Sequence, residues 1–116
     1  MKHIKLFEET YKGFYVHDLV IVDIEYSKGY YEKPVEKFLT SNVGEIISLD
    51  FSIAKIQYPS NELSDIYVKI DPYMNNARDA EIFNNIKQIY IMHLRHATEK
   101  EIEEYNLLKS TIKYNL

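Results

Sequence analysis

The chain has 116 residues, of which 46% are hydrophobic and 28% are charged, and its net charge is −4. These values indicate one folded domain, because the chain is too short to build a second core, and they differ clearly from the composition of a disordered chain. The absence of cysteine excludes a disulfide framework and cysteine-ligated metal sites, and no apolar run is long enough to predict a transmembrane helix.

The N-terminal part of the chain predicts strands. Residues 1–9 reach acidic side chains before any hydrophobic region develops, so we expect no signal peptide and a cytoplasmic protein. Residues 2–7 are expected to form a short first strand. Residues 14–25 are rich in β-branched side chains and predict a central strand.

A short helix is predicted next. Pro34 follows a polar, tyrosine-bearing segment and suits the first turn of a helix, where its missing N–H is not needed. The apolar residues of this helix are Val35, Phe38 and Leu39, whose spacing places them on one face.

Residues 43–58 hold the clearest alternation of apolar and polar side chains in the chain. The apolar positions are odd-numbered from Ile47 to Ile53 and even-numbered from Ala54 to Tyr58. Because a change of parity exchanges the two faces of a strand, the sequence predicts a tight turn or a bulge near residues 50–53.

The segment after this alternation has weaker patterns. A turn is predicted at residues 59–62, and the isoleucines and valine at 66–70 predict a further strand. A short helix is then predicted over residues 77–85, with Asn75 or Asn76 as its cap.

The last third of the chain predicts a strand that runs into a helix. Residues 86–94 predict the strand, and Thr98 and Glu101 have the spacing of a capping box, in which each side chain binds the other residue's backbone N–H. The helix is predicted over residues 98–113. Its apolar stripe consists of Ile102, Tyr105, Leu108 and Ile112.

Four segments carry short motifs in a fixed order: Val-His-Asp-Leu-Val-Ile-Val at 16–22, Val-Gly-Glu-Ile at 43–46, Ala-Lys-Ile-Gln-Tyr at 54–58 and Leu-Arg-His-Ala-Thr-Glu-Lys-Glu-Ile at 94–102. In this order they resemble the small SH3-like barrel proteins that bacteriophages encode. The chain departs from that pattern at His17, where glycine is usual, and at residues 71–85, which are longer than the usual loop.

The resemblance implies a mainly β fold with α additions, an α+β protein. It is expected to be a small SH3-like antiparallel barrel with a short inserted helix and a capped C-terminal helix. We expect a single domain over residues 1–116, with the barrel at about 14–95 and the helix at about 98–113. The resemblance also implies an origin in a bacteriophage or mobile element, but it does not imply an activity.

No catalytic or metal-binding pattern is visible in the sequence. His17 and Asp18 are neighbours on a predicted strand and therefore point to opposite faces. On the last predicted strand, His93 shares a face with Arg95 and is expected at an edge or on the barrel surface. His96 falls in the turn, and no third metal ligand has a suitable spacing. Only three glycines are present, which argues against a phosphate-binding loop. We expect no enzyme, no metal and no cofactor.

Tyrosines are the candidate contacts with a partner. In an SH3-like barrel the first long loop and the adjacent strand ends line a recognition groove, and tyrosine offers a large contact area with little rotamer entropy. The residues that the resemblance places there are Tyr26, Tyr30, Tyr31, Tyr58 and Tyr73. The composition bias of an AT-rich genome, together with ordinary core filling, is the alternative explanation for the eleven tyrosines.

The preferred function is a non-enzymatic protein-binding module. It would be a phage or mobile-element accessory protein that acts in the host cytoplasm and binds and modulates or inhibits a host protein, such as a defence protein. The alternative is a nucleic-acid-binding barrel, which requires a positive surface. That surface would need Lys28, Lys33, Lys37, Lys55 and Lys69 to converge on one face.

Overall fold

The structure is a computed structural model that describes residues 13–115, with 113–115 described by their backbone alone. Within this range, five antiparallel strands form one open sheet that is accompanied by five α-helices. The strands are β1 (Leu19–Val22), β2 (Gly44–Asp50), β3 (Ile53–Gln57), β4 (Ile86–Tyr90) and β5 (Leu94–His96). The helices are α2 (Ile24–Ser27), α3 (Lys33–Ser41), α4 (Glu62–Ile70), α5 (Ala80–Phe83) and α6 (Glu99–Asn115), and a 3-10 turn, η1 (Ile91–His93), joins β4 to β5.

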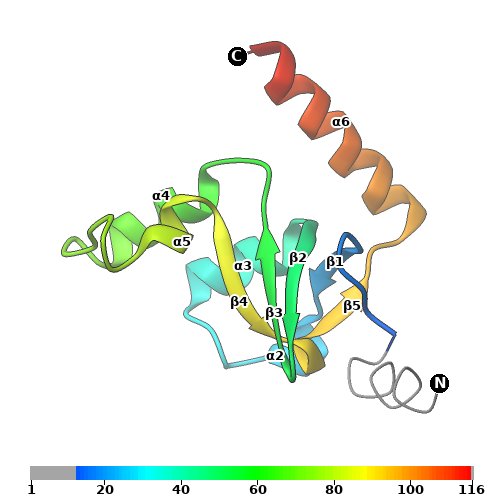
Figure 1. Cartoon of the computed structure of the whole chain (residues 1–116), viewed down its shortest axis with the longest axis horizontal. Helices are drawn as coiled ribbons and strands as arrows, with labels where there is room; N and C mark the ends of the chain where they lie inside the picture. Colours follow the sequence, from blue (N-terminus) through cyan, green and yellow to red (C-terminus); the bar gives the residue numbers. More distant parts are fainter. Residues whose placement is uncertain (1–12, 116) are drawn as a thin grey trace.

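The strand order in the sheet is β4-β3-β2-β1-β5, with every neighbouring pair antiparallel (Figure 1). Thus β4 and β5 occupy opposite edges, although only η1 lies between them in the sequence. The prediction of one strand over residues 86–94 is wrong. The chain turns at Ile91–His93 so that β4 can pair with β3 and β5 can pair with β1.

The first central strand is shorter than predicted. β1 covers four residues instead of residues 14–25. His17 interrupts the extended chain because its φ is +79°, and after β1 the carboxylate of Asp23 accepts a hydrogen bond from the backbone N–H of Glu25 at 2.9 Å and caps α2. The predicted strand at residues 2–7 lies outside the described residues.

The hairpin of β2 and β3 confirms a turn near residues 50–53, and a bulge occurs earlier, in β2. The chain reverses at Phe51 and Ser52, and Phe51 has a φ of +51°. The register of the two strands shifts between Ile46 and Ser48, which is a bulge. The turn produces the change of parity, because its two residues place Leu49 opposite Ala54, whereas the bulge lies ahead of that change.

The predicted strand at residues 66–70 is wrong, because this segment belongs to α4. Its half-buried Ile66 and Ile70 fit both a strand and a helix, since the period of two also includes Val68. However, Val68 is exposed, whereas Leu63, Ile66, Tyr67 and Ile70 all pack against the core. Their spacing of i, i+3, i+4 and i+7 is the helical one.

Two short helices follow the predictions more closely. α3 confirms the helix expected at Pro34, with that proline in its first turn. α5 confirms a helix within residues 77–85, but its N-cap is Asp79 and not Asn75 or Asn76. The side chain of Asn75 instead accepts a hydrogen bond from the backbone N–H of Arg78 at 2.9 Å, in the turn before the helix.

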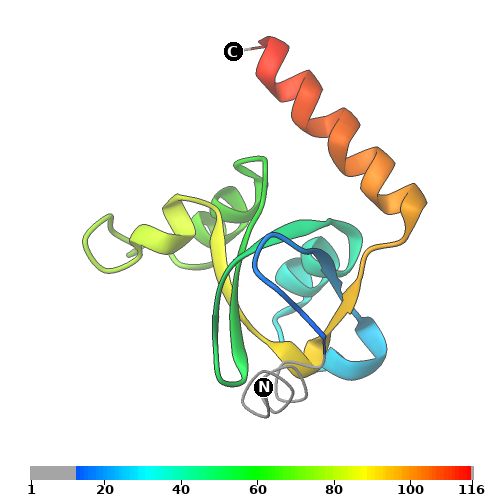
Figure 2. The same ribbon diagram turned by 45° about the vertical axis from the view of Figure 1, so that its right-hand side comes forward.

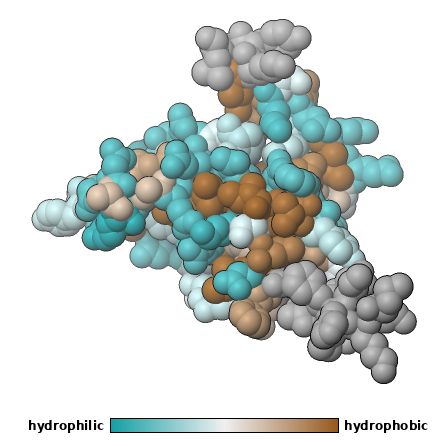
Figure 3. Space-filling model, viewed as in Figure 1, coloured by the Kyte–Doolittle hydropathy of each residue, from teal (hydrophilic) through white to brown (hydrophobic). Residues whose placement is uncertain are grey.

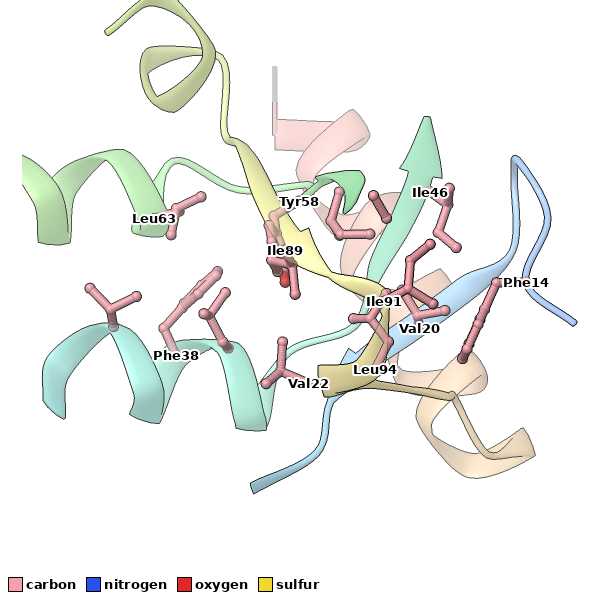
Figure 4. Close-up of a cluster of buried hydrophobic side chains, with 14 residues drawn as sticks. Phe14, Val20, Val22, Phe38, Ile46, Tyr58, Leu63, Ile89, Ile91 and Leu94 are labelled. Atoms are coloured by element: carbon pink, nitrogen blue, oxygen red, sulfur yellow. The ribbon is translucent and has the colours of Figure 1, made fainter. Parts of the chain in front are cut away.

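The hydrophobic core lies between the sheet and the helices α3 and α4 (Figure 4). Phe38 of α3 meets the ring of Tyr58 edge-on at 5.0 Å between centroids. Gly44 begins β2 directly beneath this pair: a Cβ at Gly44 would overlap with Ile56 and lie 2.9 Å from Cε1 of Tyr58. The glycine of the Val-Gly-Glu-Ile motif is therefore required by close packing.

The C-terminal helix begins as predicted. The backbone N–H of Thr98 donates to the carboxylate of Glu101 at 2.8 Å, and the backbone N–H of Glu101 donates to the hydroxyl of Thr98 at 3.2 Å, which confirms the capping box. Only the first part of α6 packs on the domain, where Tyr105 is buried, while Leu107 is 69% exposed. The helix projects from the rest of the molecule in both ribbon views (Figures 1 and 2).

The surface is unevenly polar. Apolar residues gather across the centre of the face in Figure 3, where the sheet lies, and the part over α4 and α5 is largely hydrophilic. In the part of the chain that the structure describes, no helix combines the length and the apolar character needed to cross a membrane.

Candidate protein-binding surface

An aromatic cluster joins two segments that are far apart in the sequence. It consists of Tyr30, Tyr31, Tyr90 and His93. Tyr30 and Tyr31 belong to the connection between α2 and α3, while Tyr90 ends β4 and His93 ends η1. The ring of Tyr30 lies 4.9 Å from that of His93 and 5.7 Å from that of Tyr90, in edge-on contacts. Such contacts stabilise both segments in one arrangement.

The connection that carries Tyr30 and Tyr31 is held by its backbone. Gly29 has a φ of +80°, which glycine adopts without steric cost, and its N–H donates to the carboxylate of Glu36 at 3.2 Å. The N–H of Tyr30 donates to the carbonyl of Ser27 at 2.9 Å. The turn thereby directs the two tyrosines toward β4.

His93 is the buried member of the aromatic cluster. Its Nδ1 lies 3.0 Å from the hydroxyl of Tyr31. Burial lowers the pKa of His93 and raises the pKa of Tyr31, so the imidazole is neutral and the phenol keeps its proton. The Tyr31 hydroxyl can therefore donate to Nδ1 of His93. The expected surface position of His93, on the same strand face as Arg95, is wrong because η1 turns it inward.

Lys87 of β4 lies beside the aromatic cluster and is half-buried. Its Nζ is 5.8 Å from the centroid of the Tyr31 ring and 5.5 Å from that of the Tyr67 ring. Burial lowers the pKa of Lys87. Among the described residues, no carboxylate forms an ion pair with its ammonium group. Two aromatic faces partly compensate this cation, but no anion does.

A hollow of about 180 Å³ opens at this place. Four consecutive residues of β4 line it, so it follows the free edge of the sheet and does not lie on one face. The lining residues are Tyr30, Tyr31, Ile53, Lys87, Gln88, Ile89 and Tyr90. Tyr30 is 57% exposed, and its pKa is raised first by its side-chain hydrogen bond with Tyr90.

The backbone groups of β4 alternate between its partner strand and the free edge. Ile91 N–H donates to Ser52 carbonyl oxygen at 2.8 Å, and Tyr58 N–H donates to Asn85 carbonyl oxygen at 2.9 Å. In an antiparallel pair the hydrogen-bonded residues alternate with unbonded ones. Counting inward from these two bonds, the second and fourth residues of β4 bind β3. The N–H and C=O groups of the first, third and fifth residues point away from it.

The structure brings together only two of the five predicted contact tyrosines, Tyr30 and Tyr31. Tyr26 is 61% exposed on α2, beside a different hollow that it shares with Met92. Tyr73 is 84% exposed in the connection between α4 and α5.

Tyr58 is a correction to the predicted contacts. It is 3% exposed, and burial raises the pKa of its hydroxyl. Its ring fills the core beside Phe38, so it presents no surface to a partner. Ordinary core filling, and not contact with a partner, therefore explains Tyr58.

Sequence reasoning missed Tyr90, His93 and Lys87 as members of this surface. All three fall in the segment predicted as a single strand. Lys87 was the available signal, because it shares a strand face with the apolar Ile89 and a charged residue on such a face needs a structural or functional reason.

The histidines that drew attention in the sequence lie elsewhere. His17 is exposed in the turn before β1, with Nδ1 2.8 Å from the carboxylate of Glu45. Asp18 accepts a hydrogen bond from the backbone N–H of Tyr15 at 2.9 Å. The ring of His96 stacks on that of Phe14 at 4.4 Å between centroids. No group of three potential metal ligands occurs within the described residues.

The lysines required by the nucleic-acid alternative are spread over several elements. They end α2 (Lys28), belong to α3 (Lys33 and Lys37), lie in β3 (Lys55) or end α4 (Lys69). Lys55 is also paired with Glu81, with 2.7 Å between nitrogen and oxygen. An ion-paired lysine contributes less to a positive surface.

Comparison of the chain with protein-family models, with curated proteins and with solved structures found no match.

Proposed function

We propose that the chain is a non-enzymatic protein-binding module whose binding surface is the aromatic cluster together with the free edge of β4. The observation that carries this proposal is the convergence of Tyr30, Tyr31 and Tyr90 at a hollow along the outer edge of β4, which pairs with no further strand of residues 13–115. Tyrosines of this kind are enriched in protein interfaces because their rings are large and rigid and their hydroxyls form hydrogen bonds.

The finer fold assignment belongs to the same proposal. Two features support an SH3-like barrel arrangement: the strand order β4-β3-β2-β1-β5 and the 3-10 turn that joins β4 to β5. His17, at the position where the resembling family has glycine, has a φ of +79°, a backbone conformation that favours glycine. This agreement adds to the resemblance in motif order.

From that resemblance we further propose a bacteriophage or mobile-element origin. The chain would then act in the host cytoplasm as an accessory protein that binds and modulates or inhibits a host protein. Tyr26 and Tyr73 remain additional contact candidates because both are exposed. Neither is part of the aromatic cluster, so they would extend the contact area and not form its centre.

The experiment that tests the proposal is affinity capture from bacterial lysate with matched variants. The wild-type chain is compared with the Tyr30→Ala/Tyr90→Ala double variant and with Leu107→Ala, which removes an exposed apolar side chain from α6. We expect a specific protein that is captured by the wild type and the Leu107 variant and is lost with the double variant. Capture that the double variant leaves unchanged contradicts the proposal.

A gel-shift experiment at low salt addresses the alternative function. A nucleic-acid complex that weakens steeply as salt rises would indicate phosphate contacts and would replace the protein-binding proposal. We expect no such complex, because the chain is acidic overall and one of the lysines concerned is ion-paired.

A further inference from the structure

We propose that the partner binds as an extended segment that adds a strand to the β4 edge and that this segment carries a carboxylate for Lys87. This inference rests on the proposed function and specifies the chemistry of the partner. An added strand satisfies backbone hydrogen-bonding groups, and side-chain hollows beside it select the sequence.

Three backbone groups of β4 are available at its outer edge. By the alternation described above, the N–H and C=O groups of Gln88 and the N–H of Tyr90 point away from β3, while the C=O of Tyr90 begins the 3-10 turn η1. β4 is the last strand in the sheet order, so no strand within the described residues pairs with these groups. They lie two residues apart, which is the spacing at which one added strand forms its hydrogen bonds.

The two edge strands of the sheet differ in length and in how their charged side chains are held. β5 is only three residues long, and its Arg95 is held in an ion pair with Glu101. Shortness and charge are ordinary protections against unwanted strand pairing. β4 has five residues without proline, and its one charged side chain, Lys87, is turned inward between two tyrosine rings. The β4 edge is therefore long enough to pair with another strand, and Lys87 is the protection that a partner would have to neutralise.

Lys87 determines the charge that we expect of the partner. Lys87 is half-buried without an ion-pair partner among the described residues, and it lines the same hollow as the exposed Tyr30. A hollow of about 180 Å³ accommodates one side chain. A carboxylate at that position would supply the missing anion, whereas a lysine or arginine would be repelled by Lys87.

The probe for the test is a phage-displayed library of random linear decapeptides selected on the wild-type chain. We expect the enriched peptides to share an aspartate or glutamate flanked by residues with high strand propensity. One enriched peptide is then synthesised for binding measurements. Failure to enrich any peptide, or enriched peptides without an acid, overturns the inference.

Variants of Lys87 test the charge step. Lys87→Met keeps the apolar stem and removes the charge, and Lys87→Arg keeps the charge. We expect Lys87→Met to weaken peptide binding by on the order of tenfold, as for a lost partner in an interfacial ion pair, and Lys87→Arg to retain most of the affinity. Equal binding by the Met variant and the wild type overturns the role of the carboxylate.

Amide hydrogen exchange tests strand addition without any substitution. In the free protein the amides of Gln88 and Tyr90 should exchange quickly, while those of Lys87 and Ile89, which face β3, should be protected. With saturating peptide, we expect exchange at Gln88 and Tyr90 to slow at least tenfold. Unchanged exchange at both amides overturns strand addition.

A proline variant and a concentration series complete the test. Gln88→Pro removes one outward N–H and should abolish peptide binding, while Gln88→Ala, which removes the same side-chain contact with Glu81, should not. Thermal unfolding confirms that both variants fold. Protection that rises with the concentration of the free protein would show that a second copy occupies the edge, against the inference.

These outcomes separate the inference from the proposed function. If lysate capture depends on Tyr30 and Tyr90 but not on Lys87 or the Gln88 N–H, the protein-binding function stands and the strand-addition inference falls. If capture does not depend on the tyrosines, the proposed function itself falls.

Discussion

Arg95 and Glu101 form a bidentate ion pair across the turn that joins the sheet to α6. Nη1 of Arg95 lies 2.8 Å from Oε1 of Glu101, and Nη2 lies 2.9 Å from Oε2. The same carboxylate accepts the backbone N–H of Thr98 and so also caps the helix. One side chain thereby fastens an edge strand to the helix that follows it, and the orientation of α6 depends on it.

Replacement of Glu101 should loosen this junction. Glu101→Ala removes the cap and the ion pair, and we expect a loss of about 1–2 kcal/mol in the free energy of unfolding, measured by urea denaturation. Glu101→Gln keeps an acceptor for the Thr98 N–H and should lose less. Equal stability of the Ala variant and the wild type would contradict this account.

Glu101 also predicts a dependence of stability on pH. The hydrogen bond with Arg95, followed by that with the Thr98 backbone, lowers the pKa of Glu101 from 4.5 to about 2. Because the pKa is lower in the folded state, this stabilisation is present above pH 4.5 and is lost as the pH falls toward 2. Glu101→Gln should be less sensitive to acid in this range, as followed by circular dichroism.

His93 predicts a second dependence at higher pH. Burial lowers its pKa below 6.5, so the folded state binds the proton less readily than the unfolded state. The free energy of unfolding should therefore begin to decrease as the pH falls below 6.5, before the range in which Glu101 titrates. His93→Gln can still accept from the Tyr31 hydroxyl and should flatten this slope. An unchanged slope in the variant would assign it to other groups.

His17 should be a site of backbone strain. Its φ of +79° disfavours a residue with a Cβ. We expect His17→Gly to raise the free energy of unfolding by up to about 1 kcal/mol, because the hydrogen bond lost with Glu45 is exposed and contributes little. His17→Ala is the matched control: it loses the same hydrogen bond, keeps the strain and should not be stabilised.

Gly44 should tolerate no side chain. A methyl group there would overlap with Ile56 and crowd Tyr58, so we expect Gly44→Ala to cost about 1–3 kcal/mol of stability in urea denaturation. Adding Ile56→Ala, which removes the overlapping group, should make the double variant more stable than the sum of the two single losses predicts. Strict additivity would show that the overlap is not the cause.

Features that depend on residues close in the sequence could be predicted without the structure. The turn of the β2–β3 hairpin followed from the parity change between Ile53 and Ala54, whereas the bulge between Ile46 and Ser48 did not. The start of α3 followed from Pro34, and the start of α6 followed from the capping box of Thr98 and Glu101. In each case the determining interactions span only a few residues, so the local pattern contains them.

Features that depend on distant residues were decided only by the tertiary structure. α4 has a strand-like and a helical pattern at once, and its contact with the core selects the helix. The segment after α5 reads as one strand, but pairing with β3 on one side and β1 on the other divides it at η1. The same pairing brings Tyr90 and His93 to Tyr30 and turns Lys87 inward. The candidate surface thus arises from long-range pairing, which no local pattern specifies.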